Sequence, residues 1–94
     1  MAVLMTQEFE GTPELYDKVN QTMDVASNPP EGLLIHTVQQ VGDKMRVVDV
    51  WESPSAFEAF AQERLGPAVG EVVGDDAPQP TDPEFSELYN VIKP

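Results

Sequence analysis

At two places in this sequence a strand-like run passes directly into a helix start, and these two junctions constrain the fold more than any other feature. At each junction a hydroxyl residue precedes a proline, first as Thr12-Pro13 and again as Ser53-Pro54. A hydroxyl side chain caps a helix by accepting a hydrogen bond from an amide of the first turn, and proline fits the first helical position. We therefore expect a helix to begin at Pro13 and another at Pro54, each preceded by a strand.

The segments between these junctions have the periodicity of strands or helices. Gly42-Asp43 predicts a two-residue type II′ turn between two strands. Gly66 predicts the end of the second helix, because glycine commonly follows a helix C-terminus. The predicted elements are strands over residues 2–9, 33–40, 45–52 and 86–92 and helices over residues 13–26, 54–65 and 67–73.

The resulting order, β-α-β-β-α-β, predicts a ferredoxin-like α+β protomer with a four-stranded antiparallel sheet. Right-handed crossovers place both helices on one face of this sheet. The other face would be left bare although several of its positions are apolar, so we expect a second copy of the chain to cover it and form a dimeric α+β barrel. The 94 residues suit one domain spanning 1–94. Without cysteine, oligomerisation is the usual means of stabilising so small a chain.

The charge balance excludes several classes of partner. The formal net charge is −12, from 17 acidic and 5 basic residues. So few cations cannot form a basic surface for nucleic acid or for an anionic membrane. The charge indicates solubility, or else steering of a cationic substrate. No apolar run approaches the ~20 residues of a membrane helix, and residues 1–5 lack the features of a secretory signal, so we expect a cytoplasmic protein.

Common metal and cofactor motifs are missing from the sequence. There is no glycine-rich phosphate loop, no HExxH and no nucleophile elbow. Four carboxylates in or beside a predicted linker over residues 74–83 lack the spacing of a calcium loop. These residues are Asp75, Asp76, Asp82 and Glu84. We expect a solvated segment there, and we expect neither a metal nor a cofactor.

The register of the predicted hairpin brings a histidine and an aspartate together. Pairing across Gly42-Asp43 puts His36 opposite Asp49 and Leu34 opposite Trp51, and side-chain alternation puts all four on one face. The opposite face carries the aliphatic residues Leu33, Ile35, Val48 and Val50. Because that aliphatic set suits packing against helices, we expect His36, Asp49 and Trp51 to face away from the helices, into the space between two sheets.

These residue types suit proton transfer from an aromatic ligand. An aspartate beside a histidine orients the imidazole and favours its protonated form, so His36 and Asp49 are the predicted catalytic pair. Trp51 is a predicted flat wall for the substrate, and Gln7 and Asn90 are predicted to bind it by hydrogen bonds. Such a pair is also common as a structural or dimer contact, and a tryptophan near a helix start is commonly core.

The segment Val50–Phe60, VWESPSAFEAF, resembles the corresponding part of antibiotic biosynthesis monooxygenase-like proteins of the dimeric α+β barrel superfamily. The element order agrees with theirs over nearly the whole chain. The resemblance implies a homodimer joined through its sheets, with a pocket between sheet and helices in each subunit. Some relatives oxygenate polycyclic phenols without a cofactor, and others bind haem through a histidine on a helix. The only histidine here is predicted on a strand, so the haem role does not carry over, and Trp51 is the one residue transferred from the family's pattern.

Two functions follow from the sequence. The first is a cofactor-independent monooxygenase acting on a small aromatic or polyketide-like molecule, with His36 as the base. The second is a non-catalytic dimer that binds a small molecule or serves a structural role. A packed interior without a ligand-sized cavity would favour the second.

Overall fold

A four-stranded sheet and a layer of helices make up the fold, in a computed structural model that describes residues 2–74 and 80–92. The elements are β1 (Val3–Glu10), α1 (Pro13–Met23), β2 (Leu33–Val41), β3 (Lys44–Trp51), α2 (Pro54–Phe60), the π-helical turn η1 (Ala61–Leu65), α3 (Gly66–Val73) and β4 (Glu84–Glu87). The strands lie in the order β2-β3-β1-β4, and every neighbouring pair is antiparallel. This is the predicted ferredoxin-like α+β arrangement.

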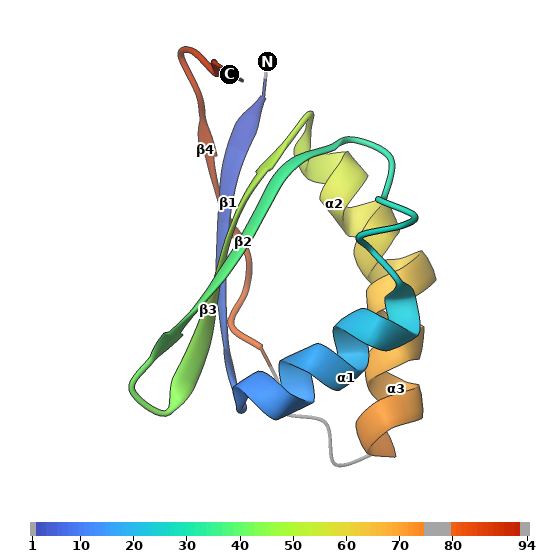
Figure 1. The fold of residues 1–94 in the computed structure, drawn as a ribbon. Coiled ribbons are helices and arrows are strands. Elements are labelled where there is room, and N and C mark those ends of the chain that lie inside the picture. Colours follow the sequence, from blue (N-terminus) through green and yellow to red (C-terminus); the bar gives the residue numbers. More distant parts are fainter. Residues whose placement is uncertain (1, 75–79, 93–94) are drawn as a thin grey trace.

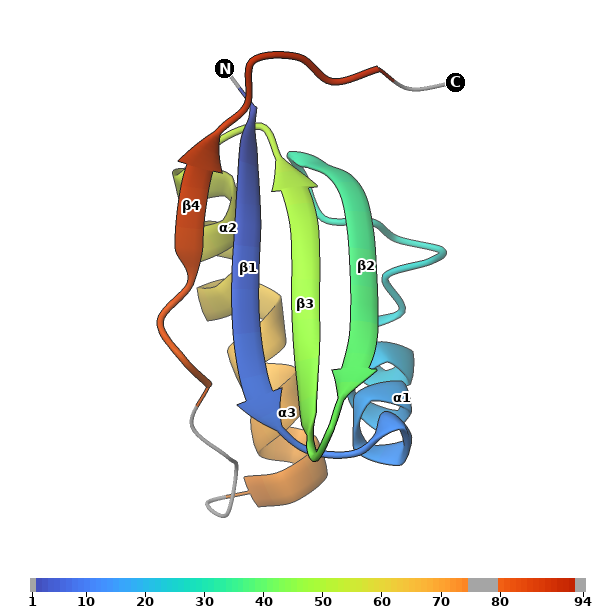
Figure 2. The same cartoon turned by 90° about the vertical axis from the view of Figure 1, so that its left-hand side faces the viewer.

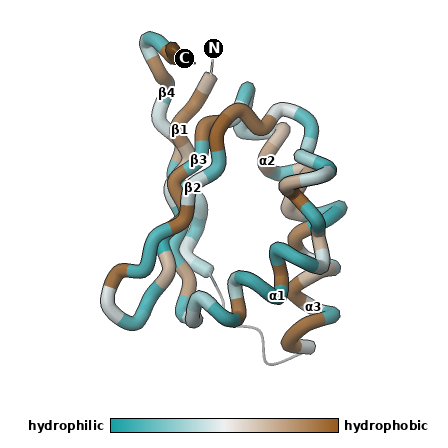
Figure 3. Tube along the Cα trace, viewed as in Figure 1, coloured by the Kyte–Doolittle hydropathy of each residue, from teal (hydrophilic) through white to brown (hydrophobic). Residues whose placement is uncertain are grey.

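All helices lie on the same side of the sheet (Figure 1). Turning the molecule shows the four strands from the other side, with no helix in front of them (Figure 2). Hydrophobic residues recur between hydrophilic ones along α1 (Figure 3), as expected for a helix with one face turned inward. Within the described residues, no helix is both long and apolar enough to cross a lipid bilayer.

Both predicted helix starts are confirmed. The Thr12 hydroxyl accepts a hydrogen bond from the amide of Leu15, and the Ser53 hydroxyl accepts one from the amide of Ala56, each at 3.2 Å. The first helix ends at Met23, three residues before the predicted end. Asp24 adopts a left-handed conformation there (φ 55°) and donates its amide hydrogen to the carbonyl of Asn20, which closes the last turn.

The predicted hairpin register is confirmed at its centre. Gly42 has a positive φ of 63° and Asp43 does not, as a type II′ turn requires, and His36 pairs with Asp49. The prediction is wrong at the far end, where an irregularity between Leu33 and Ile35 places Leu33, not Leu34, opposite Trp51. A bulge of this kind shifts the register by one residue and cannot be read from the turn.

The prediction that Gly66 ends the second helix is wrong, because the chain stays helical from Pro54 to Val73. Gly66 has right-handed helical angles (φ −57°, ψ −52°), and its amide donates to the carbonyl of Ala61, five residues earlier. The following Pro67 has no amide hydrogen, and its ring would crowd the carbonyl of Glu63 in a regular α-helix. The wider π turn of η1 relieves this crowding and lets the helix continue.

The last strand lies earlier than predicted. β4 covers Glu84–Glu87 instead of residues 86–92, and it pairs with the first half of β1. Val3 pairs with Glu87, and the amide of Leu88 donates to the carbonyl of Ala2 at 3.0 Å, which is the last backbone contact between the two strands among the described residues. Two acidic residues of the predicted 74–83 linker, Asp75 and Asp76, lie outside the described residues.

The core lies between the sheet and α2. Its buried residues are Val3, Met5, Trp51 and Phe57. The Trp51 ring meets Phe57 edge-on at 5.6 Å and the tilted ring of Phe60 at 5.5 Å between ring centres. These contacts join β3 to α2 next to the capping residue Ser53. The end of β3 that carries the candidate site residues is therefore packed against the helices.

Candidate functional site

A cavity of about 650 Å³ lies between the sheet and the helices. Its walls include Met5 and Gln7 from β1, Leu15 and Val19 from α1, and Val69 from α3. Most of the lining side chains are apolar, and the volume falls within the roughly 300–1,000 Å³ typical of small-molecule sites. The interior is therefore large enough for an organic ligand of several rings.

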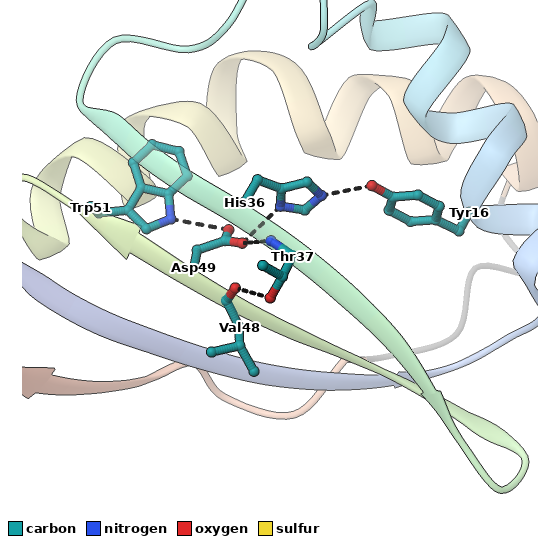
Figure 4. A network of polar contacts seen from close by, with 6 residues as sticks. All are labelled: Tyr16, His36, Thr37, Val48, Asp49 and Trp51. Carbon is teal, nitrogen blue, oxygen red and sulfur yellow. Dashed lines mark hydrogen bonds and ion pairs between the residues drawn. The ribbon is translucent and has the colours of Figure 1, made fainter. Parts of the chain in front are cut away.

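A chain of hydrogen bonds runs across one wall of this cavity (Figure 4). His36 on β2 approaches Asp49 on β3, with 2.7 Å between Nδ1 and Oδ1. The other imidazole nitrogen, Nε2, lies 2.6 Å from the hydroxyl oxygen of Tyr16 on α1. The three side chains thus link two strands of the sheet to the helix layer.

Asp49 is only 4% exposed and accepts two further hydrogen bonds. The indole Nε1–H of Trp51 donates to Oδ2 at 3.2 Å, and the amide of Thr37 donates to Oδ1 at the same distance. The hydroxyl of Thr37 is turned away and donates to the carbonyl of Val48. A buried carboxylate needs such partners, since an unpaired one would carry a large desolvation cost.

The contacts of Asp49 fix the tautomer of the neutral imidazole. A carboxylate can only accept, so Nδ1 of His36 carries the hydrogen and donates it to Asp49. Nε2 then bears the free electron pair and accepts the hydrogen bond of the Tyr16 hydroxyl. His36 is consequently arranged as a base whose reactive nitrogen points away from the aspartate and toward α1.

Tyr16 is held in its neutral form. Burial raises the pKa of its hydroxyl above the ordinary value for tyrosine, and the negative charges of Asp49 and Asp17 raise this pKa further. A group with a raised pKa keeps its hydrogen at neutral pH. Tyr16 is therefore a hydrogen-bond donor to Nε2 and not a tyrosinate.

No positively charged lysine or arginine occurs among the described residues that line the cavity, whereas Asp49 and Glu58 do line it. The net charge of the whole chain, −12, adds to this negative environment. An anionic ligand would enter without a countercharge and lose its hydration. The site thus disfavours anionic ligands.

The comparison with known proteins rests on structure, since no family model matches the sequence and no curated protein resembles it. A candidate antibiotic biosynthesis monooxygenase from Chloroflexus aurantiacus superposes with a TM-score of 0.67 at 15% identity, covering 99% of this chain and 98% of that one. SnoaB, a cofactor-independent oxygenase from Streptomyces nogalater, gives a TM-score of 0.65 at 16% identity, with 97% and 96% covered. A protein of unknown function from Nitrosomonas europaea gives 0.71 at 17% identity, with 99% and 94% covered.

The chain has the antibiotic biosynthesis monooxygenase-like fold. The resemblance carried by Val50–Phe60 is confirmed at the level of the fold. Identities this low extend to the fold and not to the activity, so the chemistry of this protein has to be argued from its own side chains.

The predicted facing of the site residues is wrong. His36, Asp49 and Trp51 line the cavity beneath the helices and do not look into a space between two sheets. The prediction gave the helices the purely aliphatic face, but the helices here cover a cavity whose wall includes buried polar groups. Ile35, at 40% exposure, belongs to the uncovered face together with its partner Val50.

The two predicted substrate-binding amides differ in position. Gln7 lines the cavity from β1, and its side-chain amide donates to the carbonyl of Thr81 at 3.0 Å. Asn90 does not line the cavity. It lies beyond Glu87, the last residue of β4, and is exposed, so its predicted place on the last strand and at the site is wrong.

Tyr16 is the functional candidate that the sequence did not reveal. The helical period placed it on the apolar stripe of α1, together with Leu15, Val19 and Met23. A tyrosine among aliphatic residues on the inward-facing stripe of a helix is the signal that could have singled it out, because a hydroxyl withdrawn from solvent requires a hydrogen-bond partner. The partner, His36, lies 20 residues away and becomes apparent only in the folded chain.

Residues 2–74 and 80–92 contain no candidate metal site, that is, no group of three or more histidine, cysteine, aspartate or glutamate side chains that could hold an ion. Both nitrogens of His36 are already engaged, by Asp49 and by Tyr16. The arrangement is suited to moving a proton at Nε2 next to an apolar cavity.

Proposed function

We propose that this protein is a cofactor-independent monooxygenase that acts on an uncharged aromatic or polyketide-like phenol. The observation that carries the proposal is the Asp49–His36 hydrogen bond of 2.7 Å on the wall of a cavity of about 650 Å³. The cavity favours ligand binding over the alternative of an interior filled by side chains. The description of the structurally similar SnoaB as a cofactor-independent oxygenase supports the type of reaction.

In the proposed reaction His36 takes up the proton of the phenol, directly or through a neighbouring group. The resulting anion carries its charge into the ring and gives an electron pair to dioxygen. One oxygen atom remains in the product as a quinone carbonyl, and the other leaves as water with the two hydrogens that the substrate loses. The imidazolium formed on His36 is stabilised by Asp49, whose charge it neutralises.

The aromatic side chains at one end of the cavity support the aromatic character of the substrate. Trp51, Phe57 and Phe60 line the cavity there and pack against one another. Trp51 itself is 1% exposed, so it contributes by holding Asp49 and the two phenylalanine rings in place more than by direct contact with a ligand. Because this is the only tryptophan in the chain, its fluorescence reports directly on occupancy of the cavity.

We expect the protein to consume dioxygen with a neutral tricyclic phenol such as anthrone in its enol form, and to bind its carboxylated analogue at least 10-fold more weakly. A tenfold loss corresponds to about 1.4 kcal/mol, a modest value for a carboxylate placed in a site without a cation. Oxygen uptake at an electrode and quenching of Trp51 fluorescence measure the two effects. The reaction mixture contains no added flavin, haem or metal, and a chelator is present.

Spontaneous oxidation of the phenol at the same pH is the control for oxygen uptake. Binding of the neutral phenol without oxygen uptake above this control would make the protein a binding module and refute the oxygenase. Equal affinity for the carboxylated analogue would contradict the argument from charge.

We also propose that the protein forms a homodimer in which a second copy of the chain covers the uncovered face of the sheet. Ile35 is 40% exposed there, beside Val48 and Val50 of β3. Such a patch on an isolated chain loses water-exposed apolar area when two copies meet. The cavity lies on the opposite side of the sheet, so a dimer of this kind leaves one cavity in each protomer.

A charge placed in this patch tests the dimer. We expect Ile35→Glu to halve the mass measured by analytical ultracentrifugation, because a buried glutamate without a partner strongly disfavours association. Gln21→Glu adds the same charge on the exposed side of α1 and is expected to leave the mass unchanged. An unmodified protein that sediments as a monomer would refute this part of the proposal.

A further inference from the structure

The proposed base has no free electron pair facing the cavity. Nδ1 of His36 carries the hydrogen bonded to Asp49, and the electron pair on Nε2 accepts the hydrogen of the Tyr16 hydroxyl at 2.6 Å. A substrate hydroxyl therefore cannot reach Nε2 while Tyr16 keeps this position. Either Tyr16 moves away, or the proton passes through it.

Tyr16 is placed to make the second route possible. It lines the cavity from α1, and its ring lies nearly parallel to the imidazole, with 18° between the two planes. A phenolic oxygen that donates its own hydrogen still has electron pairs with which to accept another hydrogen bond. The oxygen of Tyr16 can thus contact a ligand hydroxyl while it remains bonded to His36.

We propose that Tyr16 is a catalytic residue that relays the proton of a neutral phenol to His36, an inference that rests on the proposed function. The O–H bond of the substrate breaks as a new O–H bond forms on Tyr16, and the original hydrogen of Tyr16 moves to Nε2. Tyr16 ends neutral, the substrate gains one negative charge and His36 gains one positive charge. No electron is transferred in this step.

The charges around Tyr16 agree with a relay. The charged or titratable groups near Tyr16 are His36 on β2, Asp49 on β3 and the neighbouring Asp17 on α1. Burial and the two carboxylates raise the pKa of the Tyr16 hydroxyl. The ionised form of Tyr16 is therefore unfavourable. A proton removed from it is replaced at once from the substrate, which makes concerted movement of the two protons favourable.

The imidazolium also becomes the cation that the cavity otherwise lacks. Among the described lining residues there is no lysine or arginine to stabilise a phenolate. After the transfer, the Tyr16 hydroxyl donates a hydrogen bond to the new anion, and the charged His36 lies directly behind it. The relay thus forms the anion and its countercharge in one step.

The test uses a dye that reports proton transfer without oxygen chemistry. 2-Hydroxyanthraquinone is a neutral phenol whose ionised form absorbs at longer wavelength, and it is already a quinone. Stopped-flow absorbance without oxygen follows ionisation of the bound dye, and Trp51 fluorescence follows its binding. We expect rapid ionisation in the unmodified protein and an ionisation rate at least 100-fold lower in Tyr16→Phe, with binding little changed.

Tyr89→Phe is the matched control, since Tyr89 is 99% exposed and loses only a solvated hydroxyl. A second readout, which needs no variant, is the ionisation rate of the dye measured in mixtures of light and heavy water. If two protons move in the same step, a plot of this rate against the fraction of heavy water is curved, whereas transfer of a single proton gives a straight line. Circular dichroism checks that Tyr16→Phe is folded.

Three results would overturn the relay. The first is ionisation of the dye in Tyr16→Phe that is as fast as, or faster than, in the unmodified protein. This result would mean that Tyr16 only blocks access to Nε2. The second is a linear dependence on heavy water, and the third is an unmodified protein that fails to bind or ionise the dye. Ionisation of the dye without oxygen uptake on any phenol would leave the relay standing and refute only the proposed oxygenase.

Discussion

Replacing His36 by alanine is expected to lower the rate of oxygen uptake with an accepted phenol by about 10²- to 10⁴-fold, the usual contribution of a general base. The reason is the role of Nε2, which is the atom of the Asp49–His36–Tyr16 chain that finally holds the substrate's proton in the proposed reaction. The substrate retains its proton in the variant, so the loss falls on kcat. Affinity, followed by Trp51 fluorescence, is expected to change less than 10-fold.

Two further variants make this result specific. Gln40→Ala, exposed on the same strand and outside the cavity lining, is expected to keep the full rate. Asp49→Asn is expected to have a rate of oxygen uptake between those of His36→Ala and Gln40→Ala. Its amide oxygen can still accept a hydrogen bond from Nδ1 of His36, but the neutral side chain no longer neutralises the imidazolium. Full activity of His36→Ala would exclude His36 as the base and leave the pair as a structural contact.

Replacing Trp51 by alanine is expected to lower the free energy of unfolding by about 3–5 kcal/mol, the range observed for large aromatic residues removed from a core. The side chain is 1% exposed and packs against Phe57 and Phe60. Its removal also takes the Nε1–H from Asp49, whose Oδ2 then lacks that donor. Against a total stability of about 5–15 kcal/mol for typical proteins, this is a large fraction.

Urea unfolding followed by circular dichroism measures this loss, since the variant has no tryptophan fluorescence. The comparison is made at one protein concentration, because association would stabilise the folded state by mass action. Trp51→Phe keeps a ring against α2 and is expected to cost about 1–3 kcal/mol, the range for a buried group left without its hydrogen bond. A loss below about 1 kcal/mol for alanine would contradict the packing described for Trp51.

The helix starts and the hairpin register could be predicted from the sequence because their causes are local. Thr12 and Ser53 act on amides three residues away, and Gly42-Asp43 determines the pairing of His36 with Asp49 by itself. A few adjacent side chains contain all the information that such features need. The pair at the centre of the candidate site was therefore predictable.

The face on which that pair lies could not be predicted in the same way. Alternation tells which residues share a side of a strand, but not which side the helices cover. The aliphatic set around Ile35 and Val48 was given to the helices because apolar surface favours burial. In the structure the helices enclose a cavity, so the usual preference for an aliphatic face does not apply to them.

Contacts between distant segments account for the remaining differences. Tyr16 meets His36 only because α1 folds back over β2, and helical spacing alone says no more than that its side chain faces inward. The extent of β4 depends on its pairing with β1, which among the described residues ends with the hydrogen bond from Leu88 to Ala2. In both cases the position of a residue is determined by a contact with a segment far away in the sequence, so the local sequence does not reveal it.

The cavity draws its chemistry and its shape from different parts of the chain. The proton acceptor and its carboxylate stand on β2 and β3, whereas much of the apolar wall comes from α1, α3 and the π turn between α2 and α3. Residues such as Val69 can therefore change in size while the distance between His36 and Asp49 stays the same. A lineage of such proteins can exchange one substrate for another by altering helices alone, and the same division makes these helices the natural target for redesigning selectivity.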